Sequence, residues 1–248
     1  MFQRDVAPGI HRIEHNHTNF YLVEDGDRVT IVDACIPPAW GSLPKALAEI
    51  GRTLGDVDAL ILTHAHFDHI GFAERARREL GVDVWVHEAD EPLTKHPRTY
   101  RRERPLLQYV LTQPRAFPVL AGFITSRGMW PPAVEQVRTF TERQDLPVTG
   151  APKTVFTPGH TDGHCAFHYP DRDAVIAGDC VVVYDPYLAK ACGPKVVSRA
   201  ATADSAQALS TLDALAATGA KTVLTGHGDP WTQGAEAAVE HARAVGVT

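Results

Sequence analysis

In the first part of the chain, apolar and polar residues alternate in short runs that are separated by turn-forming residues. A period of two is typical of β-strands that bury one face. Three such runs predict strands at Ile10–Glu14, Phe20–Glu24 and Arg28–Val32. The turn Asp25-Gly26-Asp27 directly joins the last two, so we expect an antiparallel opening to the fold.

The pattern then changes to apolar residues at helical spacing. Apolar positions 43, 46, 47 and 50 predict a helix over Ser42–Ile50, and Ile70–Leu80 has the pattern of an amphipathic helix. Apolar runs before and after the second helix predict strands at Asp58–Leu62 and Val82–Val86. Strands and helices therefore alternate in this part of the chain.

The second half repeats the mixture of strands and helices. Apolar runs predict strands at Thr154–Phe156, Cys165–His168, Ala174–Ala177 and Thr222–Leu224. Helices are expected at Ala203–Ala217, which is rich in alanine, and at Glu236–Ala244. Two similar α/β halves predict two sheets packed face to face with helices outside, a four-layer αββα sandwich.

A segment of different character lies between the halves. Residues 88–137 combine apolar and basic stretches with prolines, which predict short helices and loops instead of sheet. We call this segment the insertion. Length (248 residues) and a hydrophobic content of 44% fit one domain over residues 1–248, of which the insertion is a helical, lid-like part.

Composition argues against several classes of protein. The net charge of −6 gives no general attraction for nucleic acid. No run approaches the roughly 20 apolar residues that span a bilayer, and the N-terminus lacks the pattern of a signal peptide, so we expect no membrane partner and a cytoplasmic protein. The four cysteines show no CxxC pairing, which favours a reducing compartment.

A local basic stretch lies in the insertion. It contains six basic side chains and one tyrosine: Lys95, His96, Arg98, Tyr100, Arg101, Arg102 and Arg104. Such a stretch could meet an anionic substrate, or it could be a solvated face paired with neighbouring acids such as Glu103. The sequence leaves both interpretations open.

The run Thr63-His64-Ala65-His66-Phe67-Asp68-His69 directly follows a predicted strand. Three imidazoles and a carboxylate within six positions suit zinc, iron or manganese and not packing. If the chain stays extended beyond Leu62, His64 and His66 point to one side and can hold one metal. Asp68 and His69 then lie near the start of the following helix and face elsewhere, where a second metal could be held.

Three later strand ends offer further ligands. Apolar runs lead into His160, Asp179 and His227, and each has a glycine beside it that allows a tight turn and a close backbone approach. Taken singly, each residue could be a cap or a core group, but together with the histidine cluster they indicate one site. Cys180 follows Asp179, and we interpret it as a buried small hydrophobic residue and not as a nucleophile.

With these residues the chain resembles the metallo-β-lactamase-fold hydrolases, and in particular the glyoxalase II-like branch. The family's HxHxDH motif matches His64, His66, Asp68 and His69. The resemblance implies that His64, His66 and His160 hold one metal, that Asp68, His69 and His227 hold a second, and that Asp179 bridges them. It also matches Asp33 to an aspartate that supports the ligands from behind.

The resemblance implies two divalent metal ions, Zn²⁺ before Fe or Mn, and a small-molecule acyl substrate. We hypothesise that a hydroxide bridging the metals hydrolyses a thioester, a lactone or a related carboxylic ester, and that Asp68 relays the proton. Tyr184 and Tyr187 lie where similar lactonases place a tyrosine near the substrate carbonyl. The aspartate at 179 disfavours a true β-lactamase, in which Ser or Cys commonly stands there.

We expect the residues that contact the substrate to lie in the insertion. His69 and His160 are 91 positions apart (160 − 69), which leaves room for such a segment between the ligands. Six apolar residues could wall an acyl chain or ring, or could instead pack the insertion onto the body: Phe117, Leu120, Phe123, Ile124, Met129 and Trp130. The insertion could also make a homodimer contact. The chain ends 21 residues after His227 (248 − 227), so we expect no separate glutathione-binding helical domain.

Two other activities share parts of this motif set. A persulfide dioxygenase-like oxidoreductase would use a single iron held by His64, His160 and Asp179. A ribonuclease Z-like nuclease would use the same ligands, but the acidic charge balance disfavours it. A binding protein without catalysis is disfavoured because the ligand set is complete.

Overall fold

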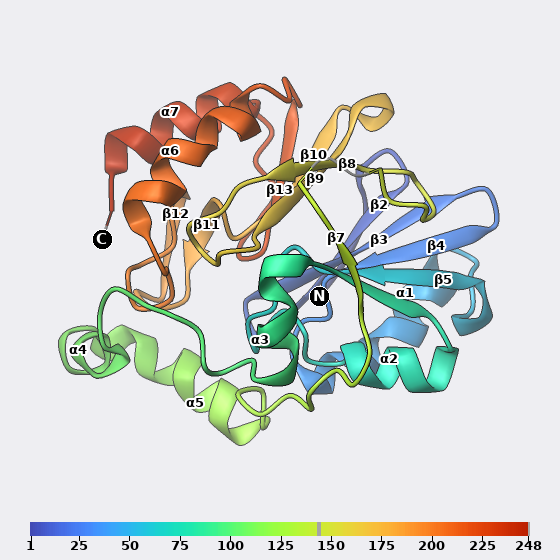
Figure 1. The fold of residues 1–248 in the computed structure, drawn as a ribbon, viewed down its shortest axis with the longest axis horizontal. Coiled ribbons are helices and arrows are strands. Elements are labelled where there is room, and N and C mark those ends of the chain that lie inside the picture. Colours follow the sequence, from blue (N-terminus) through green and yellow to red (C-terminus); the bar gives the residue numbers. More distant parts are fainter. Residues whose placement is uncertain (143–144, 248) are drawn as a thin grey trace.

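The computed structural model describes residues 1–142 and 145–247. Two β-sheets lie against each other in the middle of the molecule, and helices cover their outer faces (Figure 1). The predicted four-layer αββα architecture is therefore confirmed. Within the described residues, none of the helices combines the length and hydrophobicity needed to cross a bilayer.

The first sheet has seven strands in sequence order, antiparallel from β1 to β4 and parallel from β4 to β7. Its strands are β1 (Phe2–Ala7), β2 (Ile10–His15), β3 (Thr18–Asp25), β4 (Arg28–Val32), β5 (Val57–Ile61), β6 (Asp83–His87) and β7 (Arg138–Phe140). The two edge strands, β1 and β7, were not predicted from the sequence. The centre of β1 is exposed and β7 buries only Phe140, so neither carries the alternation of a half-buried strand.

The second sheet has the order β13-β10-β9-β8, with β10 and β13 parallel and the other pairs antiparallel. Its strands are β8 (Lys153–Phe156), β9 (Cys165–Tyr169), β10 (Ala174–Gly178) and β13 (Thr222–Thr225). A separate two-stranded ribbon pairs β11 (Val182–Asp185) with β12 (Lys190–Lys195). This ribbon was not predicted, because burial does not alternate along β11 or β12 and because β12 contains Gly193 and Pro194.

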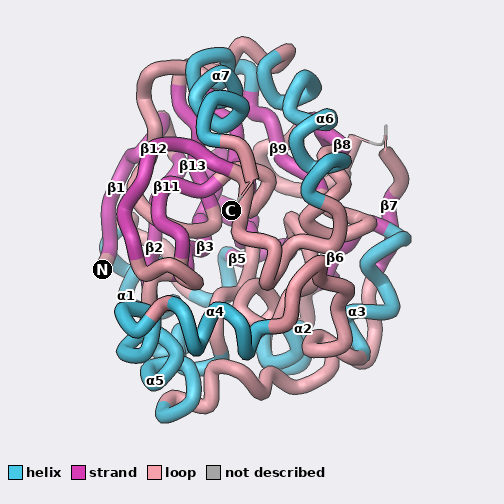
Figure 2. The backbone as a smooth tube through the Cα atoms, turned by 90° about the vertical axis from the view of Figure 1, so that its left-hand side faces the viewer, coloured by secondary structure: helices cyan, strands magenta, loops and turns pink. Residues whose placement is uncertain are grey.

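The helices of the two outer layers are α1 (Leu43–Glu49) and α2 (Ala73–Leu80) on the first sheet, and α6 (Ser205–Ala216) and α7 (Ala235–Val245) on the second. The insertion holds α3 (Glu91–Lys95), α4 (Leu106–Thr112) and α5 (Phe117–Thr125). Short 3₁₀ helices lie at Pro37–Ser42 (η1), Leu54–Asp56 (η2), Glu88–Asp90 (η3), Pro114–Ala116 (η4) and Pro170–Arg172 (η5). Viewed from the side, α4 and α5 lie far from α6 and α7 (Figure 2).

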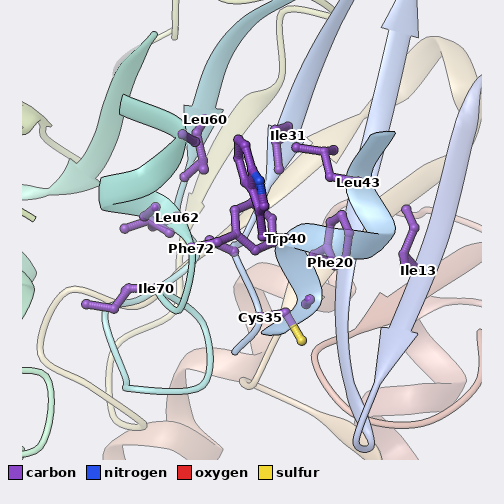
Figure 3. Close-up of a cluster of buried hydrophobic side chains, with 14 of the residues drawn as sticks. Ile13, Phe20, Ile31, Cys35, Trp40, Leu43, Leu60, Leu62, Ile70 and Phe72 are labelled. Carbon is purple, nitrogen blue, oxygen red and sulfur yellow. The ribbon is translucent and has the colours of Figure 1, made fainter. Parts of the chain in front are cut away.

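Alternation along the central strands creates separate hydrophobic cores. On β5, Leu60 joins the core under α1 and α2, whereas Ala59 and Ile61 enter the core between the sheets. The first of these cores gathers large rings, including Phe20, Trp40 and Phe72 (Figure 3). On the second sheet, β10 likewise sends alternate side chains into the inter-sheet core and into the core under α6 and α7.

The sheet topology brings four strand ends together. β4 and β5 are parallel neighbours in the first sheet, and β10 and β13 are parallel neighbours in the second, so the carboxyl ends of each of these pairs lie at one edge of its sheet. The chain leaves these ends through the residues that the sequence singled out: Asp33, the run from His64 to His69, Asp179 and His227. This edge is where α/β folds commonly place a functional site.

Candidate metal centre

Three histidines form the first ligand group: His64, His66 and His160. Each has a ring nitrogen within 4.8 Å of the others, and all three side chains are buried. The ring centroids of His64 and His66 are 4.7 Å apart, and those of His66 and His160 are 4.5 Å apart. His64 and His66 therefore point to one side of the segment after β5, as the extended backbone predicts.

The second ligand group contains Asp68, His69 and His227, whose ligand atoms also lie within 4.8 Å of one another. Asp68 and His69 lie in a turn before α2, which starts at Ala73, and the ring of His69 also lies beside that of His64, with centroids 4.1 Å apart. Nε2 of His227 lies 3.5 Å from Oδ2 of Asp68. The two groups are therefore adjacent, and His69 lies at the boundary between them.

Asp179 lies between the two groups. Its Oδ2 is 3.5 Å from Nε2 of His160 in the first group and 3.3 Å from Nε2 of His227 in the second. Its Oδ1 is 3.6 Å from Nε2 of His69. One carboxylate therefore faces both groups, which is the position that a bridging ligand would need.

Several polar atoms of these groups are buried without a hydrogen-bond partner. They are Nε2 of His64, His66, His69 and His160 and Oδ1 of Asp179. Buried polar atoms are normally paired, so a cluster of unpaired nitrogen and oxygen atoms indicates a site for a further binding partner. Imidazole nitrogens and carboxylate oxygens are donors that zinc, iron and manganese accept, so divalent cations fit the site.

On the opposite side of four of the rings, Nδ1 contacts a polar atom of the protein: in His64, His69, His160 and His227. Nδ1 of His227 is 2.7 Å from the backbone oxygen of His17, and Nδ1 of His64 is 3.0 Å from Oγ1 of Thr63. A histidine that donates from Nδ1 presents its lone pair on Nε2, towards the cluster. These contacts fix the orientation that a metal ligand requires.

Asp33 supports the ligands from behind. It is 1% exposed and leaves β4 with φ of 62°. Its Oδ2 is 2.9 Å from Nδ1 of His69, and its Oδ1 accepts a hydrogen bond from the backbone N–H of Thr63 at 2.8 Å. Asp33 therefore connects the end of β4 to the start of the histidine run and orients His69, instead of being a surface turn residue.

Two residues of the site were not singled out from the sequence, and His164 is the first. Its Nε2 accepts a hydrogen bond from the backbone N–H of Asp179 at 3.0 Å, and its Nδ1 is 2.9 Å from Oγ1 of Thr157. A side chain on Gly178 would collide with this ring, so glycine allows the close approach. His164 comes four residues after His160, a spacing that could have drawn attention to it.

Asp90 is the second residue of the site that was not singled out from the sequence. It is completely buried and accepts three hydrogen bonds, from the backbone N–H groups of Ala65 (3.0 Å) and Gly163 (2.8 Å) and from Oγ1 of Thr161 (2.8 Å). It therefore joins the segment of His64 and His66 to the segment of His160. The only sequence signal was its place shortly after β6, in the same way that Asp33 follows β4.

The two groups differ in electrostatics. Burial, reinforced by the neighbouring imidazoles, lowers the pKa of His64 and His66 well below the usual value. Burial also lowers the pKa of His69, but the carboxylates of Asp179 and Asp33 outweigh it and raise that pKa to about 10. His227 and His69 hold the pKa of Asp179 far down in spite of its burial. The first group is therefore neutral and the second is rich in ion pairs.

An apolar pocket opens beside the centre and begins at Asp68. Four of the six apolar residues expected on the substrate side line it: Phe117, Leu120, Phe123 and Met129. Ile124 and Trp130 are outside the lining, with 47% and 48% of their surfaces exposed. The expectation of an apolar wall thus holds for part of the predicted set.

The two tyrosines expected near the substrate separate in the structure. Tyr187 is half-buried and lines the pocket together with Asp68. Tyr184 is absent from the lining, and its ring instead stacks on His17 with centroids 4.4 Å apart. Cys180 is buried and its pKa is raised to about 12 by that burial, which agrees with a packing residue.

The basic stretch of the insertion mostly makes internal contacts. Lys95 donates to the backbone oxygens of Val134 and Glu135, and Arg101 forms an ion pair with Asp162 at 3.0 Å. Two other guanidinium groups lie over aromatic rings, Arg98 over Trp130 and Arg102 over Tyr100. These contacts favour a structural interpretation of the stretch.

Comparison with known proteins agrees with this site. The family described as Metallo-beta-lactamase superfamily matches residues 14–227. A relative from Bacillus subtilis (strain 168), the probable metallo-hydrolase YflN, is 27% identical over 241 residues that cover 92% of this chain and 87% of that protein. The crystal structure of TTHA1623 in a di-iron-bound form has a TM-score of 0.64 and 25% identity, and the match covers 91% of this chain and 95% of that one.

A more distant similarity concerns a named activity. A hydroxyacylglutathione hydrolase from Cereibacter sphaeroides (strain ATCC 17023) is 27% identical over 177 residues, which cover 70% of this chain. The chain spans about half of that enzyme, 49% of its length. This similarity therefore gives only weak support to the expected glyoxalase II-like branch.

Proposed function

The chain belongs to the metallo-beta-lactamase superfamily, and on that basis we propose that it is a metal-dependent hydrolase that cleaves a thioester, a lactone or a related carboxylic ester. The observation that supports this proposal most is the set of buried, unpartnered Nε2 atoms that face one another around Asp179. A site built only for stability would pair these atoms, whereas a metal site needs them free.

We propose that two divalent ions are held, Zn²⁺ before Fe or Mn, the first by His64, His66 and His160 and the second by Asp68, His69 and His227. Asp179 would contact both. When bound, such ions ionise water near neutral pH and polarise a carbonyl oxygen. The ligands are all nitrogen or oxygen donors and come from four different strand ends, a donor set typical of catalytic and not of closed cysteine-rich sites.

Asp68 is proposed to move the proton. Hydrolysis joins a water oxygen to the carbonyl carbon and breaks the bond to sulfur or oxygen, so one proton must pass from water to the leaving group. Among the described residues that line the pocket, Asp68 is the only carboxylate, and it also belongs to the second ligand group.

Tyr187 is proposed to position the carbonyl. It lines the pocket next to Asp68, and its hydroxyl interacts with that of Tyr100, whose ring lies 4.1 Å from the ring of His66. A tyrosine hydroxyl can donate to a carbonyl oxygen or to the charge that develops on it. Tyr184, which faces His17, is the weaker candidate for this task.

The test begins with metal analysis and continues with a substrate panel. Chain saturated with Zn²⁺, Mn²⁺ or Fe²⁺ would be offered S-lactoylglutathione, acyl-homoserine lactones, acyl-CoA thioesters and aryl esters. We expect metal-dependent hydrolysis of at least one class, and loss of both metal and activity in Asp179→Ala but not in Asp171→Ala, which changes an exposed aspartate. Full activity of a metal-free Asp179→Ala protein would refute the proposal. One iron per chain with oxygen consumption and no hydrolysis would favour the dioxygenase instead.

A further inference from the structure

We propose that the substrate carries an uncharged, apolar group next to its scissile carbonyl, and that the pocket walled by α4 and α5 binds this group. The inference rests on the proposed hydrolase function and narrows its substrate class. It concerns a part of the molecule that the metal ligands do not explain, namely the insertion.

The pocket is continuous with the metal centre. Phe67 and Asp68, two residues of the histidine run, line it at the end nearest the ligands. Tyr100 lines the same end and lies against the ring of the ligand His66. A carbonyl held at the ligands would therefore extend its neighbouring group directly into the pocket.

The chemistry of the lining selects an apolar group. Most of the wall is aliphatic or aromatic and comes from the insertion: Leu106, Phe117, Val119, Leu120, Phe123 and Met129. The polar side chains of the lining are those of three tyrosines, of Gln113 and, at the ligand end, of Asp68. Among the described lining residues there is no Lys, Arg or His, and Asp68 at the ligand end is the only charged one.

A charged group would be unfavourable in such a pocket. Moving a carboxylate out of water is costly unless a cation or several donors replace its hydration, and the lining offers no cation. Glutathione thioesters carry carboxylates and an ammonium group, so they fit this pocket poorly. Esters or thioesters with a hydrocarbon or aromatic group fit it well.

One wall of the pocket is fixed to the body of the protein. The ring of Phe123 lies edge-on to Phe67, with centroids 5.7 Å apart, and both Phe123 and Val119 belong to the hydrophobic core under the first sheet. The lining is partly open at the start of α5, since Phe117 is 52% exposed. The pocket is thus preformed on the side of the core, and apolar surface remains available to a ligand on the other.

Two substrate series test the inference. One varies the acyl chain of 4-nitrophenyl esters from acetyl to octanoyl, and the other varies the alcohol chain of acetate esters. Burying one methylene group contributes about 0.8 kcal/mol, so we expect kcat/KM to rise about fourfold for each added methylene in at least one series. We also expect 4-nitrophenyl hydrogen succinate to react at least tenfold more slowly than 4-nitrophenyl pentanoate.

A matched pair of variants locates the effect. Ala116 lines the pocket, whereas Ala121 is exposed on α5. Ala116→Trp should fill the pocket and remove the chain-length dependence while hydrolysis of the acetyl ester persists. Ala121→Trp adds the same bulk outside the pocket and should behave as the wild type. Equal chain-length dependence in both variants would overturn the inference.

A binding measurement separates this inference from the proposed function. Calorimetric titration with 1-octanol, which has no hydrolysable bond, should give binding that Ala116→Trp weakens at least tenfold and Ala121→Trp leaves unchanged. Absence of octanol binding together with a flat response in both substrate series would refute the pocket inference, even if hydrolysis occurs. Octanol binding without any metal-dependent hydrolysis would refute the proposed function while supporting an apolar pocket.

Discussion

Asp90 gives the sharpest prediction about how the fold holds the site. Replacing it with alanine removes the acceptor that joins the segment of His64 and His66 to the segment of His160. The backbone N–H groups of Ala65 and Gly163 would then be buried without a partner. Asp90→Ala should therefore lower both the stability of the protein and its affinity for metal.

The magnitude follows from the number of donors left unsatisfied. A buried donor without a partner costs about 1–3 kcal/mol, so two N–H groups cost about 2–6 kcal/mol in the free energy of unfolding. In a protein of this length, 4 kcal/mol corresponds to a fall in Tm of roughly 8–16 °C. Loss of a group that orients metal ligands typically weakens metal binding about 10–100-fold.

Protonation of Asp90 adds a pH dependence. Burial raises its pKa from 3.8 to about 6, and a shift of this size is worth roughly 3 kcal/mol. Because the pKa is higher in the folded state, the resulting stabilisation is present below about pH 4 and is lost as the pH rises through 6. The difference in stability between the wild type and Asp90→Ala should therefore be larger at pH 4 than at pH 8.

Urea unfolding in the presence of a chelator measures the stability term, and competition with a chromophoric chelator measures metal affinity. Asp162→Ala is the matched control, because Asp162 lies between Thr161 and Gly163, which donate to Asp90, but itself forms an exposed ion pair with Arg101, which contributes little. If Asp90→Ala and Asp162→Ala unfold within about 0.5 kcal/mol of each other and bind metal equally well, the assigned role of Asp90 is wrong.

Two further predictions concern the ligands. A side chain on Gly226 would collide with Oδ1 of Asp179, so Gly226→Ala should weaken metal binding at least tenfold in the same competition assay. Gly41→Ala is the control, because a Cβ there meets nothing within 4 Å, and it should bind metal as the wild type does. Equal affinities of the two variants would contradict the packing around Asp179. Because the pKa values of His69 and His227 are raised, chelator-treated protein should release at least one proton on taking up metal near pH 7, and its affinity should increase with pH. Calorimetry in buffers of different ionisation enthalpy detects that release, and uptake without it would show that these histidines are already neutral.

Much of the architecture could be predicted from local patterns. The alternation at Phe20–Glu24 and Asp58–Leu62 and the helical spacing at Ser42–Ile50 correspond to β3, β5 and α1, because each pattern reflects burial of one face. The centre of β1 is exposed, and burial does not alternate along β11 or β12, so these strands leave no such pattern. They pair with strands adjacent in sequence, and it is the fold that places them against the rest of the protein.

The part of the site that could be predicted consists of residue types that are unusual in a packed core. The histidine run and the three later donors were found because several metal-binding side chains followed strand ends. Asp90 and His164 were missed because a buried acceptor looks like any other aspartate or histidine until its partners are known. Only the fold shows that they hold the segments carrying the ligands.

The residues expected to contact the substrate could likewise be predicted only in part. Ile124 and Trp130 were grouped with Phe123 on hydrophobicity alone, yet both are exposed. Ile124 lies on α5, and the phase of a short helix among prolines cannot be fixed from sequence, whereas Trp130 lies beyond the end of that helix. Tyr184 and Tyr187 were equivalent in sequence, but only Tyr187 lines the pocket. Which face of a segment meets the site depends on packing.

The most direct test of the central claim is an anomalous-difference map from a crystal of metal-loaded protein, recorded at the absorption edge of the ion. We predict two peaks, one about 2.0–2.2 Å from the ring nitrogens of His64, His66 and His160 and the other at the same distance from ligand atoms of Asp68, His69 and His227, with the carboxylate of Asp179 between them. Absence of a peak from this cluster in hydrolytically active crystals, or a peak bound only by other residues, would contradict the account.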